Sequence, residues 1–521
     1  MLLARLFRRC ALLSARAQPL SSSATAEFLT SHQSTTPTTT YNSSGKGRDT
    51  LGRRLLSLIY PKRSAVIVLR KWAEEGKPIQ KYQLNRVVRE LRIYKRYKHA
   101  LEICEWMRTQ PDFKLLPGDF AVHLDLVAKV RGLSSAEKFY EDLPEKMKGQ
   151  STCSALLHTY VQNKMSTKAE ELMKQMSIHG LLRCALPYNH MISLYISTDA
   201  TDKVGEMVKE LKKNTSPNEL TYNLWLTACA NINDTNTAEK IFEEMKERRL
   251  APDWVTYSIL TSIYIKSGKI SAAKEALKEM EKRVSRKERT GYCSLISLYA
   301  NLSDKENVYR IWDKMRMTFR KMSDVEYKCM LSSLAKLGEI EEAESIYNQW
   351  ESVSGTGDSR VPNILLAFYV KHRMMLKAES LHARILRAGI EPSYSTWELL
   401  AWGYLREERM NKVFDCLKRG LLSLEKWEPD IRIVRGVFDK LEKLGNVEDA
   451  EEFLVMLRGV GYVTTEIYNS LLRTYAKACK MPLIVAERMR ADNVELDGET
   501  RRLLKETSRF CVATSVSTLI S

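Results

Sequence analysis

The chain has 521 residues, of which 44% are hydrophobic and 28% charged, and its formal net charge is +18. This composition is typical of a folded water-soluble protein, and no apolar run approaches the length of about 18 residues that spans a bilayer, so we expect no membrane insertion. The charge is concentrated at one end, because residues 1–100 hold 20 Lys and Arg against five acids and the remainder is nearly neutral.

The N-terminal segment has the composition of a targeting sequence. Residues 1–26 contain four arginines, no acid, and many Leu, Ala and Ser. This pattern favours an organellar transit peptide, and a disordered basic tail is the alternative. The stretch that follows is rich in Ser and Thr, so we assign residues 1–50 to a transit peptide and a disordered segment. The Arg and Leu content favours the mitochondrion over the plastid.

A second basic segment lies near residue 90. Residues 51–80 read as helical and are predicted to form an N-terminal cap. The stretch that follows is strongly basic, and Arg89, Arg92 and Arg96 are spaced to lie on one face of a helix. Two interpretations are open for this stripe: a solvated surface, or contacts with phosphates that add salt-sensitive affinity.

Residues 219–288 consist of two segments of 35 residues that align without a gap. A fixed period of this length is typical of a repeat array. In the second segment Gly268 supplies a stop with positive φ, and Ser271 is a candidate N-cap for a second helix. Each segment is therefore predicted to be a helical hairpin that buries its apolar faces against neighbouring hairpins. Aligned residues include Tyr222 with Tyr257, Ala238 with Ala273, and Met245 with Met280.

This register extends outward to about twelve hairpins over residues 81–497, which predicts an all-α superhelical solenoid and leaves 498–521 as a C-terminal tail. The hairpins are predicted to begin at Lys81 and near Pro117, Gln150, Ala185, Glu219, Trp254, Arg289, Asp324, Ser359, Tyr394, Ile431 and Thr465. One position, where two helices should cross closely, always holds a small or β-branched residue. It is occupied by Ala100, Ala136, Ala169, Val204, Ala238, Ala273, Val308, Ala343, Ala378, Val413, Ala450 and Ile484.

Sequence motifs of catalysis are missing. The chain has no GxxxxGK[ST], GxGxxG or HExxH sequence and no zinc deaminase arrangement, so we expect neither an enzyme nor a bound cofactor or metal. Cys104, Cys229, Cys293, Cys329 and Cys416 fall in helical patterns and are predicted to be small core residues. His123, His158 and His190 are predicted to be structural.

The repeat resembles the pentatricopeptide repeat, in its plain 35-residue form found in plant organelle proteins (the P class). The resemblance rests on Thr221-Tyr222-Asn223, Pro252-Asp253, Gly268, Ala273 and Met280. It implies a right-handed superhelix of helix-turn-helix repeats. It also implies binding of single-stranded organellar RNA, mRNA or rRNA, with one base read by two or three side chains of each repeat. Some proteins of the similar subfamily are components of the plant mitochondrial ribosome.

In such proteins the fifth and last residues of a repeat meet the edge of a base, and an aliphatic second residue packs on its face. By this resemblance Asn223 with Asp253 and Asn469 with Asp497 are uracil-preferring pairs. Asn189 with Asn218 and Asn363 with Ser393 are pyrimidine pairs that lean to cytosine, and Leu186, Leu220 and Val255 suit the packing role. The other repeats depart from this pattern. Because Asn and Asp near helix starts are also ordinary N-caps, base reading and capping are both open.

Two functions are therefore expected. The first is a non-catalytic RNA-binding protein of mitochondrial RNA metabolism or translation. The alternative is a structural scaffold of the mitochondrial ribosome that contacts ribosomal proteins and rRNA.

Overall fold

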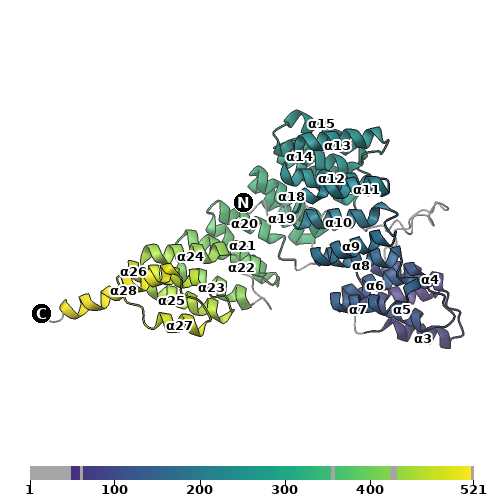
Figure 1. Cartoon of the computed structure of the whole chain (residues 1–521). Coiled ribbons are helices and arrows are strands. Elements are labelled where there is room, and N and C mark those ends of the chain that lie inside the picture. Colours follow the sequence, from purple (N-terminus) through teal and green to yellow (C-terminus); the bar gives the residue numbers. More distant parts are fainter. Residues whose placement is uncertain (1–48, 59–62, 354–357, 423–430, 518–521) are drawn as a thin grey trace. The chain divides into compact units, whose positions relative to one another are not determined.

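The structure, a computed structural model, describes residues 49–58, 63–353, 358–422 and 431–517. These ranges contain 27 α-helices, a short 3-10 helix (Glu145–Met147) and no strand, which confirms the all-α prediction. Helices α2 (Leu51–Leu56) and α3 (Ala65–Glu74) precede a series of antiparallel pairs (Figure 1). The predicted transit peptide lies outside the described residues.

Each repeat is a hairpin of a leading and a trailing helix. The leading helices are α4 (Lys81–Ile93), α6 (Pro117–Arg131), α8 (Gln150–Gln162), α10 (Ala185–Ser197), α12 (Glu219–Ile232), α14 (Trp254–Lys266), α16 (Arg289–Asn301), α18 (Asp324–Leu337), α20 (Pro362–Lys371), α22 (Tyr394–Arg406), α24 (Ile431–Leu444) and α26 (Thr465–Lys477). The trailing helices are α5 (Tyr97–Thr109), α7 (Leu133–Glu141), α9 (Ser166–Ile178), α11 (Asp202–Asn214), α13 (Thr235–Glu247), α15 (Ile270–Arg283), α17 (Lys305–Thr318), α19 (Ile340–Val353), α21 (Met375–Arg387), α23 (Met410–Leu422), α25 (Val447–Gly459) and α27 (Val485–Ala491).

Helix starts agree closely with the predicted register. Eleven leading helices begin at the predicted residue, and α20 begins at Pro362 instead of Ser359. Proline suits the first position of a helix because the N–H that it lacks would have no helical partner there. Gly268 has φ +76°, as predicted. The predicted cap Ser271 is wrong, because α15 already begins at Ile270 with Lys269 as its N-cap.

The described residues divide into two compact parts, one up to Gly291 and one from Tyr292 onward. In the first part, successive leading helices from α6 to α14 pack on one another, and each also packs on a trailing helix. In the second part, the same row runs from α18 to α26 and continues into α28 (Gly498–Ser517), which packs on α26. The segment predicted as a tail thus adds one more helix to the row.

The position predicted to lie where two helices cross closely, called the close-contact position below, is buried in every repeat except the last. Eleven of the twelve residues there are at most 1% exposed, whereas Ile484 is 67% exposed. The prediction for Ile484 is wrong by one residue, since Ile484 adopts a left-handed conformation before α27 and Val485 is buried in its place. Three of the five predicted core cysteines are buried, while Cys293 and Cys329 are only half-buried.

Glutamates on the trailing helices connect consecutive repeats. Glu379 accepts hydrogen bonds from the Tyr404 hydroxyl at 2.9 Å and from Lys412 Nζ at 2.7 Å, both in the following repeat. The Lys412 hydrogen bond lowers the pKa of Glu379. The same arrangement recurs at Glu170 with Tyr195 and Lys203, Glu344 with Tyr369 and Lys377, and Glu451 with Tyr475 and Arg488.

Replacing Glu379 by alanine is expected to lower the unfolding free energy of the C-terminal part by about 1 kcal/mol. The change removes one charged acceptor and leaves the partly buried Tyr404 hydroxyl without its partner. The urea midpoint followed by circular dichroism measures the effect. Tyr404→Phe deletes only one donor and should lower the unfolding free energy by less. An unchanged midpoint for Glu379→Ala would show that the hydrogen bonds to Glu379 do not contribute to stability.

Two histidines of the leading helices, His123 and His190, are buried, and His158 is half-buried, as expected of structural residues. His123 and His190 are 4% and 7% exposed, and the rings of His158 and His190 lie 5.0 Å apart. Burial lowers the pKa of His123 to about 4 and that of His190 to about 3. His190 is therefore neutral at physiological pH.

The N-terminal part is consequently expected to be acid-labile. A histidine of the unfolded chain has a pKa near 6.5. Below this pH the unfolded chain therefore binds protons at His123 and His190 that the folded chain does not bind. Stability is full above pH 6.5 and falls as the pH drops toward 4, by about 2 kcal/mol for each such histidine at pH 5. Urea unfolding across this pH range measures the slope. The slope of the unfolding free energy against pH gives the number of protons taken up on unfolding. His190→Leu should reduce that number by about one near pH 5, and an unchanged slope would contradict the low pKa of His190.

Candidate nucleic-acid interface

A polar trio joins consecutive leading helices, and we call each such junction a seam. At one seam Asn223 of α12 meets Asp253, the N-cap of α14, and Thr256, the third residue of α14. The Thr256 hydroxyl donates to Asn223 Oδ1 at 2.7 Å, and Asn223 Nδ2 donates to Asp253 Oδ1 at 3.4 Å. Asp253 Oδ1 also accepts the Thr256 main-chain N–H at 2.8 Å. One carboxylate therefore caps a helix and holds the asparagine of the preceding repeat.

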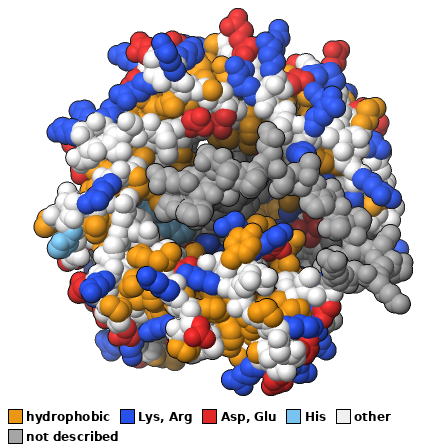
Figure 2. All heavy atoms as spheres, turned by 90° about the vertical axis from the view of Figure 1, so that its right-hand side faces the viewer, with side chains coloured by type: hydrophobic (Ala, Val, Ile, Leu, Met, Phe, Trp, Pro, Cys, Tyr) orange, Lys and Arg blue, Asp and Glu red, His pale blue; other side chains and the backbone are white. Residues whose placement is uncertain are grey.

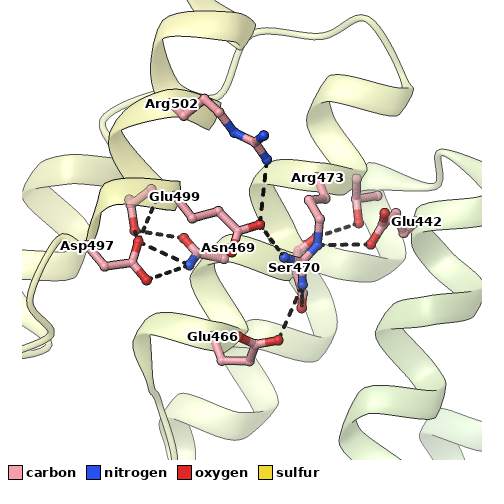
Figure 3. Close-up of polar contacts among 10 residues, drawn as sticks. Glu442, Glu466, Asn469, Ser470, Arg473, Asp497, Glu499 and Arg502 are labelled. Atoms are coloured by element: carbon pink, nitrogen blue, oxygen red, sulfur yellow. Dashed lines mark hydrogen bonds and ion pairs between the residues drawn. The ribbon is translucent and has the colours of Figure 1, made fainter.

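Three further seams repeat this arrangement. Each has an asparagine that donates to the cap residue and accepts from a threonine hydroxyl. The trios are Asn189–Asn218–Thr221, Asn363–Ser393–Thr396 and Asn469–Asp497–Thr500, with asparagine-to-cap distances of 3.2, 3.4 and 3.1 Å and threonine-to-asparagine distances of 2.8, 2.9 and 2.7 Å. The Asn469 amide points at the Asp497 carboxylate in Figure 3. The four predicted pairs are thus all in contact.

The trio has a buried end and an end near solvent. Asn189, Asn223 and Asn469 are at most 8% exposed, and the threonines are at most 1% exposed. By contrast, the caps Asn218 and Asp497 are exposed. The Thr500 main-chain N–H, followed by its hydroxyl, lowers the pKa of Asp497, so this carboxylate is charged at neutral pH.

The capping interpretation of these residues is confirmed, since Asn218, Asp253 and Ser393 all occupy N-caps. Capping leaves part of each trio available. Asp253 Oδ2 and the second Nδ2 hydrogen of Asn223 have no partner among the described residues. Base reading therefore stays a compatible prediction. Leu186, Leu220 and Val255, predicted to pack on bases, are half-buried at the second residue of their helices.

Two further polar contacts between consecutive repeats were not predicted, and each is a pair and not a trio. Asn85 of α4 donates to Asp119 at 3.1 Å, where Asp119 is the third residue of α6 instead of its cap. The available signal was that Asn85 is the fifth residue of its repeat. Lys328 and Asp358, the fifth and last residues of another repeat, form an ion pair at 3.4 Å. The threonines had no predicted role in the site, although each lies three residues after its cap and Thr221 belongs to the motif that carries the resemblance.

The predicted arginine stripe is wrong. Helix α4 ends before Arg96, which is the N-cap of α5, so Arg89, Arg92 and Arg96 do not share one helix. Arg96 donates to the main-chain oxygen of Leu56 at 2.6 Å, and Arg92 pairs with Asp125 at 2.9 Å. Arg89 is exposed. Two of the three arginines therefore hold the N-terminal repeats together.

Basic residues recur instead in the last turn of the later leading helices. They are Lys266, Lys336, Lys371, Arg406, Lys443 and Lys477. Lys266 donates to the main-chain oxygen of Ala230, at 2.7 Å, and Arg406 to that of Val370, at 3.2 Å. A cation at a helix C-terminus is favourable in itself. Four of them, Lys266, Lys371, Arg406 and Lys477, stand on helices that also contribute to a trio, whereas α10 and α12 have no basic residue in their last turns.

Acidic side chains balance much of the remaining charge. On the face in Figure 2, basic and acidic side chains of the described residues are interspersed. Near the last seam, Arg473 bonds to Glu442, Glu466 and Glu499, so three carboxylates surround one guanidinium (Figure 3). Within the described ranges, no helix has the length and apolar content to cross a bilayer. In the same ranges, no cluster of His, Cys, Asp and Glu is arranged to hold a metal ion.

Stacked helical hairpins joined by recurring polar seams define an α-helical repeat protein. Models of the PPR repeat match residues 151–181, 255–283, 327–353 and 361–390, the PPR repeat family model matches 217–262, and a pentatricopeptide repeat domain model matches 172–231. A mitochondrial pentatricopeptide repeat-containing protein of Arabidopsis thaliana is 56% identical over 91% of this chain and 89% of its own length. A second Arabidopsis thaliana protein of this name is 34% identical over 83% and 90%. The chain belongs to the pentatricopeptide repeat family.

Among solved structures, the chain is similar to the maize pentatricopeptide repeat protein PPR10, with 17% identity, a TM-score of 0.42, and coverage of 88% of this chain and 70% of that one. PPR10 has also been crystallised with an 18-nt psaJ RNA element. The mitochondrial name of the 56% identical relative confirms the predicted localisation.

Proposed function

We propose that this protein binds single-stranded mitochondrial RNA without catalysing a reaction, and that the seams contact base edges. The observation that carries the proposal is the recurrence of one hydrogen-bonded trio at four seams. Each trio uses some of its hydrogen-bonding groups to hold the fold, and others have no partner among the residues that the structure describes. Membership in the pentatricopeptide repeat family supports the same function, since such repeats read one base each.

The unpaired groups differ between seams in a way that matches different bases. Asp253 offers a carboxylate oxygen beside an N–H of Asn223, an acceptor next to a donor. Uracil is complementary to this pair, because its N3–H lies beside carbonyl oxygens. In Asn218, the Thr221 main-chain N–H occupies Oδ1, so Nδ2 is left for a ligand. With the N–H of Asn189 it forms two donors, which suit the adjacent O2 and N3 acceptors of cytosine.

The cations in the last turn of the leading helices supply attraction to phosphates. Such contacts add affinity without base choice, and the affinity falls as salt rises. The protein would thus hold RNA by its backbone and choose it by its pyrimidines. It would act in mitochondrial RNA metabolism or translation by protecting or presenting the bound segment.

The test is ultraviolet crosslinking of the tagged protein in isolated mitochondria, with sedimentation of the complexes. We expect crosslinks to discrete RNA segments in light fractions, and a strong loss when Asn189 and Asn223 are both replaced by alanine. Lys240→Ala, an exposed change on the trailing helix α13, is the matched control. Co-sedimentation with ribosomal subunits and crosslinks mainly to rRNA would overturn the proposal in favour of a ribosomal scaffold.

A further inference from the structure

The asparagine at a seam can present either end of its amide to a base. A half-turn of the amide exchanges Oδ1 for Nδ2 with little change in shape, so the hydrogen bonds around it decide which end faces where. The end that faces the bound RNA determines whether a base meets a donor or an acceptor. The partners of each asparagine are therefore as important to base choice as the asparagine itself.

At the aspartate seams the cap alone settles the orientation. A carboxylate only accepts hydrogen bonds, so it requires Nδ2 of the asparagine to face it. Asn469 Nδ2 lies 3.1 and 3.3 Å from the two oxygens of Asp497. Figure 3 shows these two contacts as dashed lines. A rotated amide would bring its oxygen against a negative charge. The Thr500 hydroxyl has one hydrogen and two acceptors, Asn469 Oδ1 at 2.7 Å and Asp497 Oδ1 at 2.8 Å, so it adds little to an orientation that the carboxylate already fixes.

The serine seam lacks this constraint. The Ser393 hydroxyl lies 3.4 Å from Asn363 Nδ2, and a hydroxyl both donates and accepts, so it tolerates either end of the amide. The Thr396 hydroxyl donates to Asn363 Oδ1 at 2.9 Å, which is the shorter contact of that amide. Thr396 Oγ1 in turn accepts the main-chain N–H of Ser393 at 3.1 Å. The Ser393 hydroxyl, whose oxygen lies 3.2 Å from Thr396 Oγ1, can donate to it as well. With both acceptor positions of Thr396 Oγ1 filled in this way, its single hydrogen is directed to Asn363 Oδ1.

We propose that Thr396 is a specificity-determining residue, because its hydroxyl fixes the orientation in which the Asn363 amide meets a base. Thr396 is fully buried and touches no base itself, so it acts as a positioning residue through Asn363. The equivalent threonines at the aspartate seams, Thr256 and Thr500, should have a smaller influence on base preference, because the carboxylate there already fixes the orientation of the asparagine amide. The inference rests on the proposed function and deepens it.

The experiment selects RNA with the purified full-length protein from a pool of random-sequence, 14-nucleotide single strands. Asn363→Ala marks the motif position that belongs to this seam. There the unmodified protein should prefer pyrimidines about tenfold over purines, the discrimination of a good side-chain pair. Thr396→Val should reduce the preference to within about twofold of none, because valine leaves the amide free to rotate.

Two further variants separate positioning from general damage. Thr396→Ser keeps the hydroxyl and should restore the preference. Thr500→Val deletes the equivalent hydroxyl at the aspartate seam of Asn469 and Asp497, in the same compact part. At the motif position of that seam, the base preference should fall less than half as much as it does for Thr396→Val. A full preference in Thr396→Val, or an equal loss in Thr500→Val, would overturn the inference while leaving RNA binding intact. A selection in which the unmodified protein enriches no sequence would overturn the proposed function as well.

Discussion

Ala378→Glu is expected to destabilise the C-terminal part by about 3 to 5 kcal/mol, the cost of a buried carboxylate without a partner. Ala378 is 0% exposed on α21, at the position where every repeat but the last buries a small aliphatic residue. A glutamate there must either ionise in an apolar contact or force the helices apart. Urea unfolding followed by circular dichroism measures the loss, and limited proteolysis locates it.

The same helix provides the control. Ala383 lies five residues further along α21 and is exposed, so Ala383→Glu adds the same side chain with no packing conflict. It should leave the urea midpoint within about 0.5 kcal/mol of the unmodified protein. Because a repeat array is stabilised by its nearest-neighbour interfaces, the damage in Ala378→Glu should spread to the adjoining repeats. Equal midpoints for the two variants would contradict the close-contact assignment.

Asp253→Asn is expected to change base choice while leaving the fold intact. Asparagine and aspartate are about equally good N-caps, so the stability of α14 should be preserved. The change replaces an acceptor by an amide held by Thr256, which makes the seam chemically equivalent to that of Asn189 and Asn218. At one motif position the preference should move from uracil to cytosine by about tenfold, the worth of one good side-chain pair.

RNA selection with the Asp253→Asn protein measures the shift, and thermal unfolding checks the cap. Asp497→Asn offers an independent repetition of the same change at the last seam. A motif that is unaltered by Asp253→Asn, in a protein of normal stability, would remove this aspartate from the RNA interface and leave it as a cap alone.

Periodicity alone predicted the hairpins and most helix starts, because a 35-residue repeat fixes every position once one pair is aligned. The failures lie where the period is broken. Ile484 is displaced because the last repeat turns irregularly before the short helix α27. Arg96 lies outside the helix predicted for it because the chain turns between α4 and α5. The spacing of the arginines alone does not reveal this turn.

The candidate site was predictable in its pairs but not in its trios. Asn223 and Asp253 stand at positions named by the family resemblance, and the structure places them in contact. Thr256 had no such prediction, since a threonine in the first turn of a helix reads as an ordinary helix residue. Its role appears only when two repeats are stacked, because its hydroxyl reaches back to the asparagine of the preceding helix.

The central claim is that seams of consecutive repeats read consecutive bases, and RNA selection with the unmodified protein tests it most directly. Asn189 and Asn223 belong to adjoining repeats, so the enriched sequence should contain two neighbouring pyrimidines, one preferring cytosine and one uracil. Replacing either asparagine by alanine should abolish the base preference at one of these two positions and leave the preference at the other unchanged. A motif without adjacent pyrimidines, or one that both variants leave unchanged, would contradict the account.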